Sequence, residues 1–113
     1  MADITATQIN AYTGTSVFVT DSNGNAALSL TALTGQTVGM DDPVNESVLK
    51  FLEACSGTAQ AEYDADNTND ARSSYPAASK TPTTANGEPI LRVTATAVGK
   101  VVITSSLDDA VAL

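Results

Sequence analysis

Apolar and polar residues follow a helical pattern over residues 43–56. The apolar positions at helical spacing are Val48, Phe51, Leu52 and Cys55. Asp42 can accept a hydrogen bond from a first-turn amide, Pro43 suits the first helical position, and Gly57 is a suitable stop. We therefore predict one main helix over residues 43–56, with its apolar face packed on a sheet.

The first 40 residues favour β-structure. Residues 16–20 are β-branched and aromatic, and residues 26–33 alternate apolar and polar positions with a period of two. Between them, residues 21–25 supply the Asp, Asn and Gly that turns require. This pattern predicts an antiparallel hairpin, and residues 4–9 are as compatible with a further short strand as with none.

A second hairpin is predicted near the end of the sequence. Residues 90–98 alternate apolar and polar side chains, Gly99-Lys100 can form a two-residue turn, and residues 101–104 lead back. Together with the main helix, the two hairpins predict a small α+β fold. The length of 113 residues favours one domain over residues 1–113.

Residues 58–89 have no regular period. They are rich in Ala, Ser, Thr, Asn and acidic residues and contain three of the four prolines. Structureless segments longer than about 15 residues are uncommon in compact domains and are often functional. We interpret this stretch as a long loop or arm that becomes ordered by contacting something else, with the alternative that the helix continues to Tyr63.

Four residues of this arm are candidates for binding a partner. Tyr63 and Tyr75 are the expected anchors, because a ring buries a large area at low entropic cost. Pro76 and Pro82 would limit the conformational freedom that the arm loses on docking. The alternative is that both rings only hold the loop against its own domain.

The composition narrows the classes of function. Ala, Thr and Ser make up 44 of the 113 residues and Trp is absent, which predicts a thin core that gains stability from an oligomer partner or a larger assembly. A net charge of −8 disfavours nucleic acid. No apolar run reaches the roughly 20 residues of a membrane span. Residues 1–5 do not resemble a secretory signal, so we expect synthesis in a reducing cytoplasm.

The sequence predicts no catalytic, cofactor or metal site. Histidine is absent, and Cys55 lies on the apolar face, which favours a buried structural thiol over a nucleophile. Residues 64–70 begin like a calcium loop, but Thr68, Asn69 and Tyr75 stand where that loop needs a ligand, a glycine and a glutamate. A solvated loop is favoured over weak Ca²⁺ or Mg²⁺ binding. We therefore expect a protein without enzymatic activity.

Three segments resemble small phage virion proteins, namely residues 1–6, 16–25 and 93–97. The most similar in character are capsid decoration (cement) proteins, including those of phages that infect cyanobacteria. The resemblance implies a virion protein that binds the outside of the major capsid protein shell, often as a trimer, and stabilises it. A helix in the middle of the chain departs from the β-tulip or immunoglobulin-like pattern of many cement proteins.

Two other classes of function stay open. One is a different virion part, such as a head-fibre base or a tail-associated module. The other is a small acidic regulatory or inhibitor domain that binds a host protein. A decoration protein would be present in purified particles at hundreds of copies, whereas an inhibitor would be absent from them.

Overall fold

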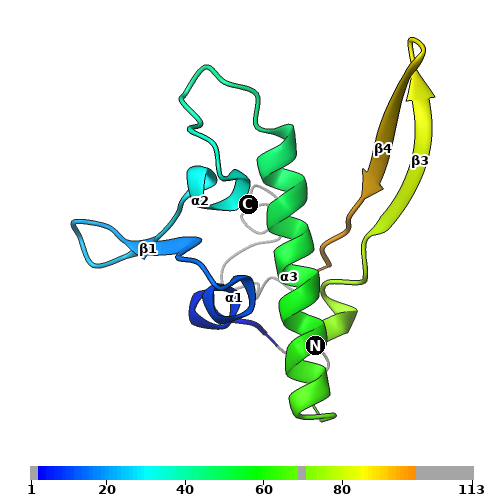
Figure 1. Ribbon diagram of the computed structural model, residues 1–113. Coiled ribbons are helices and arrows are strands. Elements are labelled where there is room, and N and C mark those ends of the chain that lie inside the picture. The colour runs from blue at the N-terminus through cyan, green and yellow to red at the C-terminus, as the bar shows by residue number, and fades with distance from the viewer. Residues whose placement is uncertain (1–2, 69–70, 99–113) are drawn as a thin grey trace, which may run out of the picture.

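A 21-residue helix, α3 (Asn45–Ala65), forms the axis on which the other elements are arranged (Figure 1). The computed structural model describes residues 3–68 and 71–98. The other elements, in chain order, are α1 (Ala6–Thr13), β1 (Phe18–Thr20), β2 (Ala26–Leu28), α2 (Leu30–Thr34), the 3-10 helix η1 (Ala71–Ser73), β3 (Ser79–Ala85) and β4 (Glu88–Thr94). On one side of α3 lie α1, α2 and the β1–β2 hairpin, and on the other the β3–β4 hairpin projects from the body (Figure 1).

The described strands form two separate antiparallel pairs, β1 with β2 and β3 with β4. The β1–β2 register pairs Phe18 with Leu28, and the β3–β4 register runs from Ser79 opposite Thr94 to Ala85 opposite Glu88. Helices and small antiparallel sheets in one small domain confirm the predicted α+β class.

The core lies where α1 and the start of β1 meet α3. Its buried members are Ile9, Val17, Ala54 and Cys55, and its partly buried members are Ile4, Phe18, Leu33, Phe51 and Tyr75. The rings of Phe18 and Phe51 meet edge to face, with their centroids 5.9 Å apart. Because α3 presents mostly small side chains to this core, the packed elements approach its backbone closely.

The predicted main helix exists, but its boundaries and its buried face differ from the prediction. It begins at Asn45, after Val44, and Asp42 does not cap it: the Asp42 carboxylate accepts the Gly39 amide at 2.7 Å and closes a loop instead. Val48 is 52% exposed, so the apolar positions do not all face the core. The buried positions of α3 are Ser47, Ala54, Cys55, Thr58 and Ala59.

Gly57 does not end α3, because the helix continues to Ala65 and so passes the Tyr63 limit that the sequence left open. A Cβ at Gly57 would overlap the ring of Tyr12, which lies against the α3 backbone there. Glycine in a helix costs about 0.5–1 kcal/mol relative to alanine. The close approach of α1 therefore explains why a helix interior contains glycine.

A double-mutant cycle tests this contact. In the Tyr12→Ala background we expect Gly57→Ala to stabilise the protein by about 0.5–1 kcal/mol, because only helix propensity changes. In the wild-type background we expect Gly57→Ala to be less favourable than in Tyr12→Ala, because the ring must move from its site. Urea unfolding of the four proteins measures the coupling. Equal effects of Gly57→Ala in the two backgrounds would contradict the contact.

Residues 4–9 do not form a strand, because α1 begins at Ala6. Thr5 and Gln8 form a capping box: the Gln8 amide donates to the Thr5 hydroxyl at 3.2 Å, and the Thr5 amide donates to the Gln8 side chain at 2.9 Å. At the other end, Gly14 adopts the left-handed conformation that closes a helix (φ 71°). These two end signals outweigh the β-branched residues between them.

The first predicted hairpin is confirmed as the β1–β2 pair, but its second strand is shorter than predicted. After Leu28 the chain forms α2, with the Ser29 hydroxyl accepting the Ala32 amide at 3.2 Å and Gly35 closing the helix. The strand predicted from the alternation is therefore wrong beyond Leu28. Ser29 caps the start of a short helix there and Gly35 ends it.

Residues 58–89 are not a structureless arm, so this prediction is wrong. They contain the end of α3, η1 and all of β3, with only residues 69–70 outside the described part. Strand β4 ends at Thr94 rather than at residue 98, because its partner is β3. The predicted Gly99-Lys100 turn and the strand over residues 101–104 lie outside the described residues.

Candidate docking surface

The β3–β4 hairpin exposes both faces of its sheet over most of its length. Its two-residue turn is Asn86-Gly87, with φ angles of 52° and 81°, which match a type I′ turn. Alternation along the strands places Pro82, Pro89, Leu91 and Val93 on one side, together with Lys80 and Thr84, and we call this side the apolar face. Leu91 is 55% exposed, and only Val93, at the base, is half-buried.

The opposite side, which we call the polar face, is dominated by threonine. Its residues are Ser79, Thr81, Thr83, Ala85, Glu88, Ile90, Arg92 and Thr94. Ile90 is the large apolar residue on it and is 44% exposed. The hairpin is thus a thin two-sided sheet, and such a sheet is only marginally stable by itself in water.

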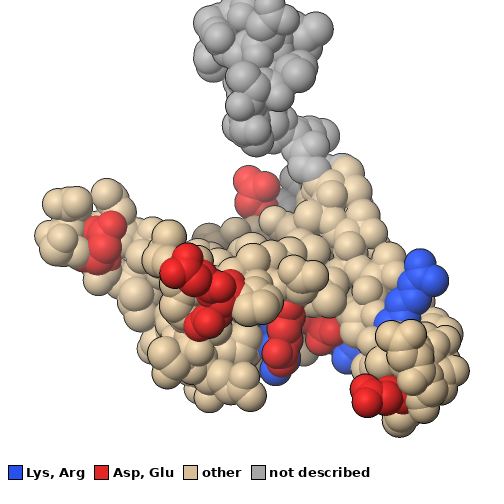
Figure 2. Space-filling view, turned by 90° about the horizontal axis from the view of Figure 1, so that it is seen from above, with Lys and Arg blue, Asp and Glu red and all other residues tan. Residues whose placement is uncertain are grey.

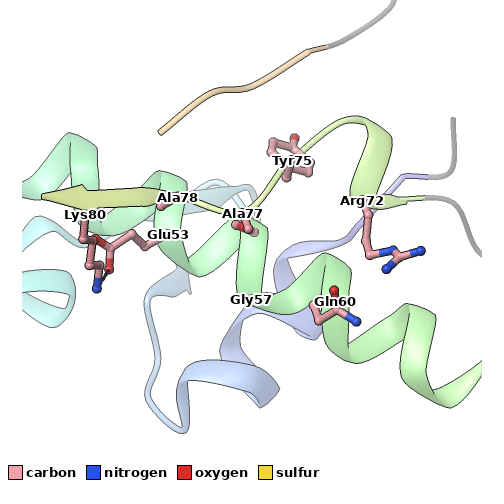
Figure 3. Close-up of a pocket in the computed structure, with 9 residues that line it drawn as sticks. Glu53, Gly57, Gln60, Arg72, Tyr75, Ala77, Ala78 and Lys80 are labelled. Atoms are coloured by element: carbon pink, nitrogen blue, oxygen red, sulfur yellow. Dashed lines mark ion pairs between the residues drawn. The ribbon is translucent and has the colours of Figure 1, made fainter. Parts of the chain in front are cut away.

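A groove of about 320 Å³ lies at the base of the hairpin, between α3 and the segment that leads into β3 (Figure 3). In it the Lys80 ammonium approaches the Glu53 carboxylate to 3.4 Å, and the Ser56 hydroxyl donates to the Pro76 carbonyl at 3.0 Å. These polar groups are therefore engaged in contacts between α3 and the hairpin segment. We call the groove and these two contacts the joint between α3 and the hairpin.

The two tyrosines that were expected as anchors contact the protein's own residues. Tyr75 lines the groove and packs against the core, and burial raises its pKa, with smaller contributions from Cys55 and Asp3. The Tyr63 ring stacks under the Arg72 guanidinium, whose Cζ lies 3.4 Å from the ring centroid. These contacts support the alternative interpretation, in which the rings hold the segment against its own domain.

The expected partner-binding prolines lie in different places. Pro76 is exposed and contributes its carbonyl to the joint, whereas Pro82 lies on the exposed apolar face of β3. The structure therefore does not bring the two tyrosines and the two prolines together into one site. Pro82 alone belongs to the hairpin surface.

The acidic segment that suggested a calcium loop is divided between two elements. Asp64 lies in the last turn of α3 and accepts from the Gln60 amide group at 2.8 Å. Asp66 follows the helix, and its carboxylate accepts the Thr68 hydroxyl at 2.7 Å and the Thr68 amide at 3.0 Å, which lower its pKa. Within residues 3–68 and 71–98, no group of three potential ligands could hold a metal ion.

Cys55 is buried in the core, as its position in the apolar pattern predicted. Burial raises the pKa of its thiol from 9.0 to about 11, so the reactive thiolate is strongly disfavoured near neutral pH. This environment is that of a structural cysteine and not of a nucleophile.

Charge also distinguishes the hairpin from the rest of the molecule. Lys80 and Arg92 outnumber its single acidic residue, Glu88, although the whole chain carries a net charge of −8. In Figure 2 acidic side chains are scattered over much of the face in view, and the largest basic area lies on the side of the hairpin. A partner that approaches the hairpin therefore meets little of the protein's negative charge.

Sequence reasoning missed this surface, although a signal for it was present. Asn86-Gly87 is among the strongest short hairpin signals, and the segments on either side of it contain Thr, Ile, Leu and Val. Pro82 and Pro89 counted against strands there, because proline cannot donate to a ladder. In this hairpin both prolines occupy positions that the internal ladder tolerates.

Comparisons with protein-family models, with curated proteins and with solved structures found no match to this chain. Among the described residues, no helix has both the length and the apolar character needed to cross a membrane.

Proposed function

We propose that this protein is a non-enzymatic assembly protein that docks onto a larger protein surface through the β3–β4 hairpin. The projecting hairpin, with Pro82, Pro89 and Leu91 exposed on its apolar face, is the observation that carries the proposal. A two-stranded hairpin that exposes apolar residues becomes more stable when its apolar surface is buried against a partner. The ion pair between Glu53 and Lys80 connects the base of the hairpin to α3.

The partner we propose is the outer surface of a phage capsid shell, formed by the major capsid protein. The resemblance to capsid decoration proteins supports this choice, and the acidic charge of the body disfavours packaged nucleic acid. On the virion, many copies would each contribute a small docking contact and together stabilise the shell. A homo-oligomer, with a trimer as the expected form, is part of the same proposal.

Leu91→Asp tests the docking surface. It places a charge at the centre of the apolar face, so we expect the affinity for shells of the major capsid protein to fall more than tenfold. Thr83→Asp is the matched control, because it adds the same charge to the polar face and should bind as the wild type does. Co-sedimentation with shells that lack this protein measures both. Binding of Leu91→Asp at the wild-type level would contradict the proposed function.

A further inference from the structure

The positions of the prolines determine what the outer edges of the hairpin can bind. In a hairpin closed by a two-residue turn, the pair next to the turn is hydrogen-bonded and the pairs then alternate. Ala85 opposite Glu88 is that first pair, so Thr84–Pro89 and Pro82–Leu91 are non-hydrogen-bonded pairs. The nitrogen atoms of both prolines therefore face outward, and the internal ladder loses nothing.

The two edges differ in how completely proline blocks them. On β3, Pro82 lies between the outward-facing Lys80 and Thr84 and interrupts any added strand at its centre. On β4, Pro89 lies beside the turn, and Leu91 and Val93 still direct their amide and carbonyl groups outward. Among the described residues, no strand pairs with either outer edge. Within residues 3–68 and 71–98, the part of β4 from Leu91 to Thr94 is thus an open edge.

A second copy of β4 fits this edge poorly. A register centred on Val93 pairs only residues 92–94 of the strand, so antiparallel pairing over more of β4 is centred on Ile90, Leu91 or Arg92. In the first two registers, Pro89 of each copy stands opposite an outward-facing residue of the other copy. Because proline has no backbone N–H, a hydrogen bond between the copies is lost there. The third places the two Arg92 side chains directly opposite each other, which is destabilising.

We propose that the open edge of β4 binds an extended segment of the partner protein with the pattern apolar–acidic–apolar, which adds to the hairpin as a third strand. In antiparallel pairing, its acidic residue lies opposite Arg92 on the polar face. Its two apolar residues lie beside Leu91 and Val93 and extend the apolar face. Main-chain hydrogen bonds supply affinity and the side-chain pattern supplies specificity.

Two further observations favour an acidic partner residue. Arg92 has no ion pair within the part of the chain that the structure describes, so its charge is available to a bound strand. Its cross-strand neighbour in β3 is Thr81, which is uncharged. The inference rests on the proposed docking function and specifies how that docking occurs.

Peptides test the predicted pattern. The probe is a fluorescent nine-residue peptide of serine and threonine with Val-Asp-Val at its centre, and the matched peptide carries Val-Lys-Val. We expect wild-type protein to bind the Asp peptide about tenfold more tightly, by fluorescence anisotropy at low salt. In Arg92→Glu the preference should reverse. Equal affinities, or no binding at millimolar protein, would overturn the proposal.

Proline substitutions test the edge itself. Leu91→Pro keeps an apolar side chain on the apolar face but removes an outward amide, so we expect loss of peptide binding. Thr84→Pro makes the same change on β3 and should bind as the wild type does, with circular dichroism as the check on folding. Peptide binding by Leu91→Pro at the wild-type level would overturn the proposal. So would a wild-type dimer that Leu91→Pro dissociates, because a second copy would then occupy the edge.

Binding of the two Leu91 variants to capsid shells distinguishes docking through the hairpin from docking by strand addition. If both Leu91→Asp and Leu91→Pro lose shell binding, strand addition is supported. If Leu91→Asp loses binding and Leu91→Pro keeps it, docking occurs through the apolar face alone and strand addition is overturned. If Leu91→Asp keeps binding, the proposed function itself fails.

Discussion

Replacing Asn10 with alanine is expected to lower the free energy of unfolding by about 2–4 kcal/mol, because two partly buried hydrogen bonds disappear. The Asn10 side chain donates to the Phe18 carbonyl at 2.8 Å and accepts the Phe18 amide at 2.8 Å. It thereby joins α1 to the start of β1 and holds the Phe18 ring against Phe51 in the core. For a domain of ordinary stability, this loss is a large fraction of the total free energy of unfolding.

Gln60→Ala is the matched control for Asn10→Ala. Gln60 also donates a side-chain amide hydrogen bond of 2.8 Å, but to Asp64 on the exposed surface of α3. We expect its loss to cost less than about 0.5 kcal/mol. Urea unfolding at neutral pH measures both variants. A loss below about 1 kcal/mol for Asn10→Ala would contradict the structural role of this residue.

Alkaline pH is expected to destabilise the protein through Cys55. The thiol is 2% exposed, and its pKa rises from 9.0 to about 11 on folding. Between these values the unfolded chain loses the thiol proton while the folded chain keeps it. The free energy of unfolding is therefore unaffected by Cys55 below pH 9 and falls as the pH rises toward 11. A difference of two pKa units corresponds to about 2–3 kcal/mol.

Comparison with Cys55→Ala isolates this effect. Tyr75 also has a raised pKa and destabilises the folded state in the same direction at high pH, but the main cause, its own burial, is common to both proteins. We expect the unfolding free energy of the wild type to decline more steeply than that of Cys55→Ala between pH 9 and 11. Parallel pH profiles would contradict the burial of the thiol.

The main helix could be predicted because its apolar residues recur at helical spacing, but its orientation could not. Val48 is half-exposed while Ser47 is buried, since α3 meets its neighbours through small side chains that allow close approach. Gly57 predicted a stop by its intrinsic preference. The Tyr12 ring, which comes from a distant part of the sequence, explains why a glycine stands within the helix instead of ending it.

Local end signals would have corrected two other predictions. The Ser29 cap begins a helix within a segment whose alternation favoured a strand, and the Thr5 and Gln8 capping box begins one in a segment where the pattern allowed a strand. The β3–β4 hairpin was harder to predict, because its two prolines are acceptable only in one register relative to the Asn86-Gly87 turn. The joint between Glu53 and Lys80 depends on tertiary structure and left no signal in the sequence.

Hydrogen exchange of the protein bound to capsid shells tests the docking claim most directly. Free protein should exchange the outward amides of Leu91 and Val93 rapidly, whereas those of α3 around Ala59 should be protected in both states. On shells, we predict new protection of the outward amides of Leu91 and Val93. Bound protein whose β4 amides exchange as fast as in the free state would contradict strand addition, and equally fast exchange over both β3 and β4 would contradict docking through the hairpin.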